Sequence, residues 1–514
     1  AKTRMEGRRA WLVLCVLGVS IGLPLHPPDV GNGEGHDGLG EVAASLHRIM
    51  GGGFRDYVPG GWPETGDFVK AAGWEGGVSA RTPVVFIPPF SGVRLLQKID
   101  NKPVHSPADL LCPRSSHGQW TPAWLPGTTG KIDIFCTIRN MAFGGRDAPQ
   151  QEGRAGTARL TMQRKGRIGE SVPRGPVLTE GAEATAADSS VSSDSEWYPA
   201  QEGVVSTFDD TFNATLYLDA SGQAAPIFGP WVKAMTKAGW KAGVDIDALR
   251  YDWRKGPDSY MAPGGAFDML KQMIENMVTA TGKKVAVVSF SMGSPMFSLF
   301  CNTHVSPTWQ SKHLANFVSL SGSFGGAASP LFSLLTGRWG KLIPHPLQGL
   351  VMSLARSMGS PPWMVPAVGV YGADKVAVQT PQRTYTLSQL GDALRDAGAT
   401  RASDFWTKFQ GQTGPWLTPN VTTHCLYGVS VPTPDVIIVS KALTASGSSG
   451  VSASFTWGDG DGTVLLPGLT ACGGGGGSDA ARLHPFVNVS HSDILKSLDA
   501  WSVVARLISS PAKP

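Results

Sequence analysis

Charge is scarce in this sequence, and the charges present are nearly balanced. Of its 514 residues, 16% are charged and the formal net charge is +4, whereas about 25% of residues are charged in a typical soluble domain. No stretch combines clustered Lys and Arg with interleaved aromatic residues, the pattern typical of nucleic-acid binding. We therefore expect no nucleic acid among the partners of this protein.

Long apolar segments are rare as well. One apolar run, from Ala10 to Leu23, follows Met5 and two arginines and is too short to span a bilayer. A basic stretch followed by such a run is typical of a secretory signal peptide; a buried N-terminal helix is the alternative. We predict a signal peptide over residues 5–28, and hence a protein that is secreted or enters a lysosome-like compartment and is peripheral at membrane surfaces.

Cysteine is infrequent too, with six in the chain. Cys15 falls in the predicted signal peptide, and Cys301 lies in an apolar helical run. The other four are Cys112, Cys136, Cys425 and Cys472. Three pairings are possible, and proximity in sequence favours Cys112–Cys136 and Cys425–Cys472. Paired cysteines fit an oxidising compartment.

Sequons give weaker support for secretion. Asn213, Asn420 and Asn488 each lie in an N-x-Ser/Thr sequence, which makes them acceptors for N-glycosylation in a secreted protein. Asn213 and Asn420 are the glycosylation candidates. Asn488 lies three residues before His491, where we expect no glycan.

Composition divides the chain into segments. Residues 29–80 are Gly-rich with little periodicity and predict a flexible extension, and residues 145–203 predict a disordered insertion. From residue 204, helical and strand patterns alternate. The apolar runs Val84–Ile87 and Val285–Phe290 predict buried strands, the second between two helices. This succession favours the α/β class, with a mostly parallel sheet covered by helices on both faces.

A sharp turn after the second strand carries a candidate nucleophile. Ser289-Phe290-Ser291-Met292-Gly293 follows the G-x-S-x-G pattern with Ser in place of the first Gly. Small residues are needed two positions before and after the nucleophile because strand and helix approach closely there. The pattern predicts Ser291 as the nucleophile and the Met292 amide as one oxyanion donor; a tight turn without chemistry is the alternative.

A serine nucleophile of this kind needs an acid and a histidine later in the chain. The loop 456–464 contains Asp459 and Asp461, and we favour Asp461 over Asp459 as the acid. Calcium binding by this loop is less favoured because no Glu follows at the required spacing. His491, between an apolar segment and the last predicted helix, is the predicted base, with His484 as the alternative.

The second oxyanion donor is expected in the loop after the first strand, Pro88-Pro89-Phe90-Ser91-Gly92. Prolines carry no N–H and are unable to donate. The Phe90 amide is therefore the candidate, and an ordinary turn is the alternative. This chemistry requires no metal and no organic cofactor.

The chain resembles the lecithin:cholesterol acyltransferase family, which includes the lysosomal phospholipase A and phospholipid:diacylglycerol acyltransferases. The residues that carry the resemblance are Tyr251-Asp252-Trp253-Arg254, Ser291 with Met292 and Gly293, Cys425-Leu426-Tyr427-Gly428-Val429 with Pro432-Thr433-Pro434, Gly460-Asp461-Gly462-Thr463-Val464, and His491. Ile87 to Asp100 also resembles the oxyanion strand and loop of that family. Two departures are Pro89, where the family usually has Gly, and Ser289, where it has a smaller residue.

The resemblance implies an α/β-hydrolase fold with a cap domain and a small membrane-binding lid subdomain. Residues 81–144 would begin the core and carry the lid, residues 204–329 and 426–514 would complete the core, and residues 330–425 would form the cap. Cys112 and Cys136 match the cysteines of a family disulfide at the lid base, and Cys425 and Cys472 match a second one. Trp120, Trp124 and Leu125 in the lid loop would contact membranes, unless both tryptophans pack into the core.

The resemblance also implies an activity. We expect a phospholipase A and acyltransferase that forms an acyl-enzyme on Ser291 and passes the acyl chain to water or a lipid hydroxyl such as that of a sterol. Its expected partners are phospholipids and a membrane or lipoprotein surface. The alternatives are a neutral-lipid lipase or esterase with the same triad, and a catalytically silent lipid-binding protein.

Overall fold

The structure is a computed structural model that describes residues 61–104, 112–123, 131–144, 197–217, 226–337, 348–412, 414, 419–444, 452–473 and 481–511. The predicted signal peptide and most of the predicted insertion over 145–203 lie outside these residues. Among the described residues, no helix is both long enough and apolar enough to cross a membrane.

A six-stranded parallel sheet forms the centre of the molecule, in the order β14-β11-β8-β7-β2-β6. Its strands are β2 (Val84–Ile87), β6 (Ile246–Ala248), β7 (Val285–Phe290), β8 (Leu314–Leu320), β11 (Thr423–Val429) and β14 (Ala481–Val487). Every residue of β2 and β7 is buried, as expected of strands covered on both faces. The predicted parallel sheet is confirmed, and these two strands have the predicted bounds.

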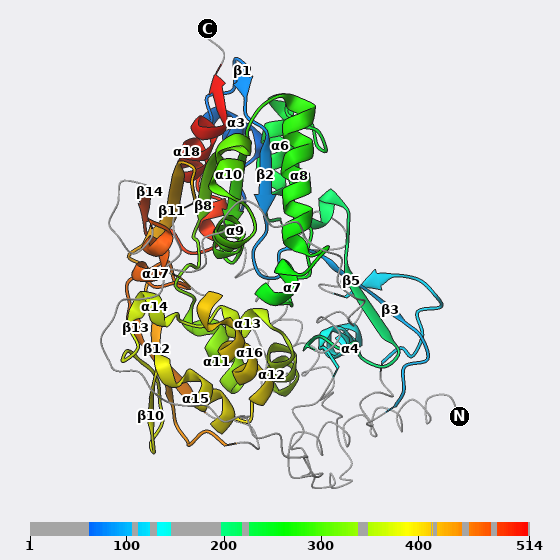
Figure 1. Ribbon diagram of the computed structural model, residues 1–514, viewed down its shortest axis with the longest axis vertical. Helices are drawn as coiled ribbons and strands as arrows, with labels where there is room; N and C mark the ends of the chain where they lie inside the picture. Colours follow the sequence, from blue (N-terminus) through cyan, green and yellow to red (C-terminus); the bar gives the residue numbers. More distant parts are fainter. Residues whose placement is uncertain are drawn as a thin grey trace, which may run out of the picture.

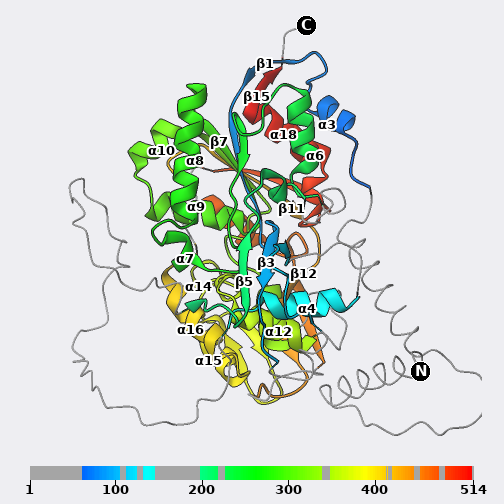
Figure 2. The same ribbon diagram turned by 90° about the vertical axis from the view of Figure 1, so that its right-hand side faces the viewer.

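Helices cover both faces of this sheet (Figures 1 and 2). On one side lie α3 (Thr65–Ala71), α6 (Gly229–Lys237) and α18 (Leu498–Ile508), and on the other α8 (Ala266–Thr281), α9 (Gly293–Thr303) and α10 (Pro307–His313). Gly282, with a φ of 65°, ends α8 in the left-handed conformation that favours glycine. The α/β class predicted from the sequence is confirmed.

The prediction of a flexible extension over residues 29–80 is wrong for its described part. Residues 65–71 form α3, and β1 (Val78–Arg81) pairs with β15 (Ser509–Pro511). The Trp501 indole N–H donates to the Phe68 carbonyl over 2.7 Å, and the rings of Trp74 and Trp501 are 5.3 Å apart. The buried aromatic side chains of this segment outweigh its glycine content.

A three-stranded antiparallel sheet lies beside the core, in the order β4-β3-β5. Its strands are β3 (Leu95–Ile99), β4 (Thr121–Pro122) and β5 (Val204–Phe208), and α4 (Lys131–Met141) lies next to it. We call the described residues of 95–144 together with 204–208 the lid subdomain. The prediction that the core begins at residue 204 is wrong for β5, because that strand pairs with β3 along its whole length.

A second sheet and a group of helices lie in the lower part of Figure 1, and we call them together the cap. Its helices are α11 (Ala328–Thr336), α12 (Gln348–Ser357), α13 (Ser360–Trp363), α14 (Val368–Tyr371), α15 (Leu390–Asp396) and α16 (Thr400–Phe409). The sheet has the order β10-β9-β12-β13, formed by β9 (Val376–Gln379), β10 (Thr384–Thr386), β12 (Thr433–Val439) and β13 (Ala453–Gly458). Short elements join the rest: η2 (Phe212–Thr215), α7 (Pro257–Met261), η4 (Leu387–Gln389), η5 (Gln410–Gln412), α17 (Leu466–Thr470), η6 (Ala471–Gly473) and η7 (Asp493–Leu495).

Two predicted boundaries of the cap need correction. Strands β12 and β13 follow residue 425 in sequence but join the cap sheet, since Ile437 and Val439 are buried in the apolar cluster of the cap. The end of the predicted insertion is also ordered against the cap: Tyr198 is buried and stacks on Phe405 at 5.4 Å between ring centroids. Both misassignments come from contacts between segments far apart in sequence.

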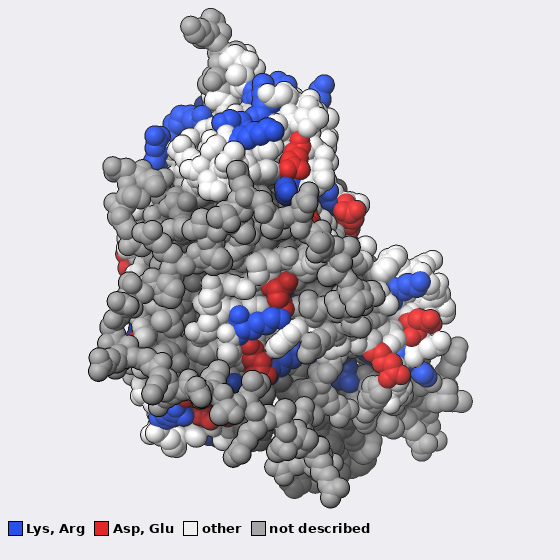
Figure 3. All heavy atoms as spheres, viewed as in Figure 1, with Lys and Arg blue, Asp and Glu red and all other residues white. Residues whose placement is uncertain are grey.

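Surface charge is unevenly distributed on the face seen in Figure 3. Lys and Arg atoms prevail at the upper end, over the region where α8, α10 and α18 lie in Figure 1. Lower on this face, acidic and basic atoms lie next to one another. The basic end is therefore the one remote from the cap.

Candidate active site

Ser291 lies in a strained turn between β7 and α9. Its φ is 54°, a left-handed value that is costly for a residue with a side chain. A Cβ atom added to Gly293 would lie 2.5 Å from the Ile87 carbonyl oxygen and 2.8 Å from that of Pro88. Glycine is therefore required at 293, and the turn is held directly against the end of β2. The amide of Met292 stands at the N-terminus of α9, where helical N–H groups have no acceptor within the helix.

Ser289, the departure from the family pattern, is accommodated by hydrogen bonding. The residue is fully buried, and its Oγ lies 2.8 Å from the Oγ of Ser294. Ser294 also accepts a hydrogen bond of 2.8 Å from Ser319. The extra hydroxyl at 289 thus has a partner, which removes the cost of burying it.

The structure brings Ser291, His491 and Asp461 into one hydrogen-bonded row. His491 Nε2 lies 2.9 Å from Ser291 Oγ, and His491 Nδ1 lies 2.7 Å from Asp461 Oδ2. Ser291 is 200 residues from His491 in the chain. This is the geometry that lets a histidine remove a proton from a serine hydroxyl while a carboxylate orients the ring.

The loop around Asp461 holds the carboxylate in place. Asp461 is fully buried, and its other oxygen, Oδ1, accepts hydrogen bonds from the amides of Thr463 (3.0 Å) and Val464 (2.8 Å). The His491 amide donates to the Asp461 carbonyl over 2.7 Å, which joins the acid and histidine loops directly. Gly428 permits this approach, since a Cβ there would lie 1.7 Å from the Val489 carbonyl oxygen.

The alternative residues for acid and base lie elsewhere. Asp459 is exposed, and its Oδ1 accepts a hydrogen bond of 2.7 Å from the Ser430 amide. His484 lies on β14, where its Nε2 is 3.1 Å from His424 Nδ1 and the two rings stack at 5.4 Å. The structure joins Ser291 to His491 rather than to either of these residues.

The His424–His484 pair predicts a loss of stability in acid. Burial lowers the pKa of His424 to about 4, aided by His484 and Arg482, and burial likewise lowers the pKa of His484. A histidine whose pKa is lower in the folded protein than its unfolded value near 6.5 binds a proton more readily when unfolded, so stability falls as the pH drops below that value. We expect the free energy of unfolding to fall by on the order of 1–2 kcal/mol between pH 7 and pH 4.5 through His424, because solvent screens part of the effect on this ring.

Urea unfolding of His424→Gln at both pH values tests this. The variant removes the titrating group, so its stability should change less with pH than that of the wild type. Equal pH dependence in the two proteins would contradict the assignment to this residue.

The predicted oxyanion loop lies beside the nucleophile turn. Its chain reverses at Ser91, whose φ is 58°, and the Gly92 amide donates to the Pro89 carbonyl over 2.9 Å. The Phe90 ring packs on Trp253 in an edge-to-face arrangement at 4.7 Å. The Tyr251 hydroxyl donates to the Pro88 carbonyl over 2.8 Å. The sequence does not predict this role for Tyr251, because a buried tyrosine needs a hydrogen-bond partner but its own segment does not show which residue that is.

Both expected disulfides are present. Cys112 pairs with Cys136 with Cα atoms 5.3 Å apart, and Cys425 pairs with Cys472 at 6.7 Å. Cys301 is a free, buried cysteine, and burial raises the pKa of its thiol. The first disulfide ties the lid loop to α4, and the second ties β11 to η6.

The remaining predicted sites are surface residues. Trp120 is 48% exposed in the lid loop, whereas Trp124 and Leu125 lie outside the described residues. Asn213 is exposed on η2. Asn420 is exposed as well, but its Nδ2 donates to the Pro307 carbonyl (3.2 Å) and to Ser311 Oγ (2.8 Å). A glycan on Asn420 would displace one of these bonds, so Asn213 is the more accessible candidate.

The fold and the arrangement of this site are those of an α/β hydrolase: the serine ends a central strand, and the acid and histidine follow it in chain order. A family model described as lecithin:cholesterol acyltransferase matches residues 190–400, which contain Ser291 but neither Asp461 nor His491. The chain is 30% identical over 304 residues to the "Lecithin-cholesterol acyltransferase-like 1" protein of Arabidopsis thaliana, covering 57% of this chain and 68% of that protein. The chain belongs to the lecithin:cholesterol acyltransferase family.

Two human proteins are also similar. The chain is 31% identical over 269 residues to "Lysosomal phospholipase A and acyltransferase", covering 52% of this chain and 62% of that protein. It is 25% identical over 283 residues to "Phosphatidylcholine-sterol acyltransferase", covering 55% of this chain and 62% of that protein. The matches thus span about three fifths of the length of these two relatives.

Proposed function

We propose that this protein is a serine phospholipase A that also transfers the acyl group to a lipid hydroxyl. The observation that carries the proposal is the row from Asp461 through His491 to Ser291, with distances of 2.7 and 2.9 Å. The substrate class is supported by the names of the two human relatives, a lysosomal phospholipase A and acyltransferase and a phosphatidylcholine-sterol acyltransferase. Secretion through the predicted signal peptide is part of the proposal.

The chemistry would proceed in two stages. Ser291 Oγ attacks an ester carbonyl of a glycerophospholipid while its proton passes to His491 Nε2, and Asp461 stabilises the resulting imidazolium. The amides of Met292 and Phe90 bind the oxyanion. The ester bond then breaks, and His491 protonates the departing lysophospholipid.

In the second stage, His491 removes a proton from water or from a lipid hydroxyl, whose oxygen attacks the acyl-enzyme. The product is a fatty acid or an acylated lipid, and Ser291 regains its proton. Water and sterol compete for one intermediate, so both products should arise from the same serine.

Defined liposomes test the activity directly. The protein is incubated with phosphatidylcholine vesicles, with and without sterol, and with an emulsion of triacylglycerol, and the lipids are analysed by mass spectrometry. Lysophospholipid with fatty acid or sterol ester would support the proposal. Turnover of triacylglycerol alone would favour the neutral-lipid lipase, and no turnover of any lipid would favour a lipid-binding protein.

Membrane contact through the lid subdomain is part of the same proposal. Trp120 is half exposed beside β4, and an indole suits the interface because it has an apolar body and a polar N–H. We expect Trp120→Ala to weaken liposome binding by about 10-fold, the order of the transfer free energy of one large apolar side chain. Hydrolysis of a soluble short-chain ester should be unchanged.

A matched control exists in the cap. Trp457 on β13 is 60% exposed, more than Trp120, and Trp457→Ala removes this indole far from the lid subdomain in sequence and fold. Binding is measured by vesicle co-sedimentation. Equal losses for Trp120→Ala and Trp457→Ala, or a parallel loss on the soluble ester, would count against a membrane contact at Trp120.

A further inference from the structure

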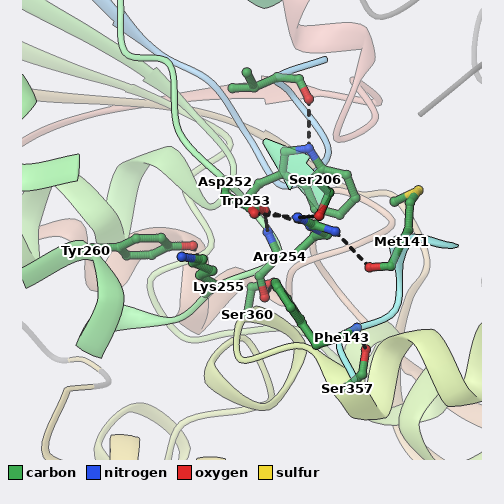
Figure 4. A network of polar contacts seen from close by, with 11 residues as sticks. Met141, Phe143, Ser206, Asp252, Trp253, Arg254, Lys255, Tyr260, Ser357 and Ser360 are labelled. Atoms are coloured by element: carbon green, nitrogen blue, oxygen red, sulfur yellow. Dashed lines mark hydrogen bonds and ion pairs between the residues drawn. The ribbon is translucent and has the colours of Figure 1, made fainter. Parts of the chain in front are cut away.

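The segment Tyr251–Arg254 follows β6 and contains no reacting group of the proposed chemistry. All four side chains nevertheless lie in the interior: Tyr251, Trp253 and Arg254 are each 1% exposed, and the Asp252 side chain is 10% exposed. Figure 4 shows the polar contacts around Arg254. A buried arginine is costly unless all its donors are satisfied, so its contacts indicate what the site is built to hold.

The guanidinium of Arg254 connects the core to the lid subdomain. Its Nε and Nη2 form a two-point ion pair with Asp252, at 2.8 and 2.6 Å. Nη2 also donates to Ser206 Oγ on β5 over 2.9 Å, and Nη1 donates to the Met141 carbonyl at the end of α4 over 2.8 Å (Figure 4). The guanidinium carbon lies 4.6 Å from the centroid of the Phe143 ring.

Asp252 is ionised in this arrangement. Burial acts to raise the pKa of its carboxyl, but the charge of Arg254 and the hydrogen bonds from it outweigh burial and hold the pKa below its usual value. The pair therefore stays charged at every pH at which the protein is expected to act. A charged, bidentate pair fixes orientation more strictly than a single hydrogen bond.

The backbone of Arg254 connects the same point to the cap. Its carbonyl accepts hydrogen bonds from the amides of Gly359 (3.0 Å) and Ser360 (3.3 Å), at the first turn of α13. The Phe143 amide donates to Ser357 Oγ at the end of α12 over 3.1 Å, a second link between lid subdomain and cap (Figure 4). Core, lid subdomain and cap thus meet at one residue.

The residues just before Arg254 hold the predicted oxyanion loop. The Trp253 indole N–H donates to the Val93 carbonyl over 2.8 Å, and its ring packs against Phe90. The Tyr251 hydroxyl donates to the Pro88 carbonyl over 2.8 Å. The two ends of the loop 88–93 are therefore fastened to two side chains whose backbone leads directly into Arg254.

We propose that Arg254 is a positioning residue for the oxyanion loop. Through Trp253 and Tyr251 it sets where the Phe90 amide lies relative to Ser291, and it does so by fixing this segment against the lid subdomain and the cap. The inference rests on the proposed function, since it concerns a donor that acts on the developing oxyanion. A displacement of such a donor by about 1 Å is enough to cost a factor of about 10² in rate.

The substitution Arg254→Lys keeps the charge but lacks the planar fork that binds Asp252 at two points. We expect kcat on a short-chain p-nitrophenyl ester to fall by about 10-fold to 100-fold, with KM within about a factor of two because ground-state binding is untouched. The pH at which activity is half-maximal should not move, because His491 and Asp461 keep their contacts. The matched control is Arg356→Lys in α12, a buried arginine that donates to the carbonyls of Leu334 and Ala397 within the cap; its kcat should match that of the wild type.

A double-mutant cycle separates positioning from general loosening. Trp253→Phe removes the bond to Val93 but keeps an aromatic ring, and it should lower kcat in the same way. If both residues act through the same loop, the combined variant should lose clearly less than the product of the two single losses. Losses that simply multiply, or a rise in KM with unchanged kcat, would overturn the proposal.

Two further observations keep the outcome unambiguous. If Arg254→Lys does not fold, Ser206→Ala deletes one partner of the guanidinium and should give a smaller loss of kcat in the same direction; unchanged kcat there would overturn the proposal. A fluorophosphonate that fails to label Ser291 in the wild type would refute the proposed function itself. Labelling of Arg254→Lys at the wild-type rate, with the wild type labelled at Ser291, would refute only the role of Arg254.

Discussion

Replacing Ser291 with alanine is expected to abolish phospholipid turnover and covalent labelling by a fluorophosphonate probe. The only heavy atom that this substitution removes is Ser291 Oγ, which lies 2.9 Å from His491 Nε2. Loss of the nucleophile in a serine triad costs about 10⁶ in kcat. Labelling is followed by mass spectrometry of the tryptic peptide, and turnover by release of lysophospholipid from liposomes.

The control for this experiment is a buried serine on α9, the helix that follows the candidate nucleophile. Ser298 is 2% exposed on α9, seven positions beyond the candidate nucleophile. Ser298→Ala likewise deletes one serine hydroxyl, and it should retain both labelling and turnover. If Ser291→Ala still released lysophospholipid at the rate of Ser298→Ala, Ser291 would not be the nucleophile.

The sequence predicts those parts of the fold whose structure depends on neighbouring residues, namely the buried strands β2 and β7 and the turn after β7. Strands β2 and β7 are continuous apolar runs, and a run of that kind is buried whichever neighbours it acquires. The turn after β7 is predictable from sequence because strain and the close approach of strand and helix restrict residues 289 and 293 to small side chains. The position of Ser291 can therefore be predicted from the residues on either side of it.

The apolar patterns of single segments do not predict which strands pair when they are far apart in the chain. Strand β5 pairs with β3 although the paired residues are 105 to 113 positions apart in the chain. Strand β12 leaves the core to lie beside β9, although neither β5 nor β12 differs in sequence type from a core strand. The bond from Tyr251 to Pro88 spans 163 residues. Phe68 and Trp74 were hidden by the Gly-rich composition around them, yet their side chains decide that α3 packs on α18. In each case the structure of a segment depends on the distant segment that it contacts, and its own sequence does not identify that segment.

The choice between two aspartates in one loop shows the same limit. Asp459 and Asp461 lie two positions apart between glycines, so either could reach a histidine as far as sequence shows. The structure separates them by burial and by contacts. Asp461 is fully buried and faces His491, whereas Asp459 is exposed and caps the turn at Ser430.

Asp461→Asn is accordingly expected to lower kcat by about 10⁴, the cost of the equivalent change in a serine triad. An asparagine placing its amide toward His491 would donate to Nδ1 and leave the proton on Nε2, where it blocks acceptance of the Ser291 proton. An asparagine turned the other way would bring its NH₂ group against the amides of Thr463 and Val464, which donate to Oδ1 in the native protein. Neither orientation restores the negative charge that stabilises the imidazolium.

The neighbouring variant Asp459→Asn provides the comparison, because it makes the same chemical change in the same loop on an exposed residue. It should keep kcat within a few-fold of the wild type, and thermal unfolding of both variants shows whether the loop survives. Initial rates on a soluble short-chain ester, measured from pH 5 to pH 9, distinguish the two aspartates without the complication of membrane binding. A larger loss in Asp459→Asn than in Asp461→Asn would transfer the role of the acid to residue 459, and it would mean that His491 is oriented by a different contact from the one at 2.7 Å.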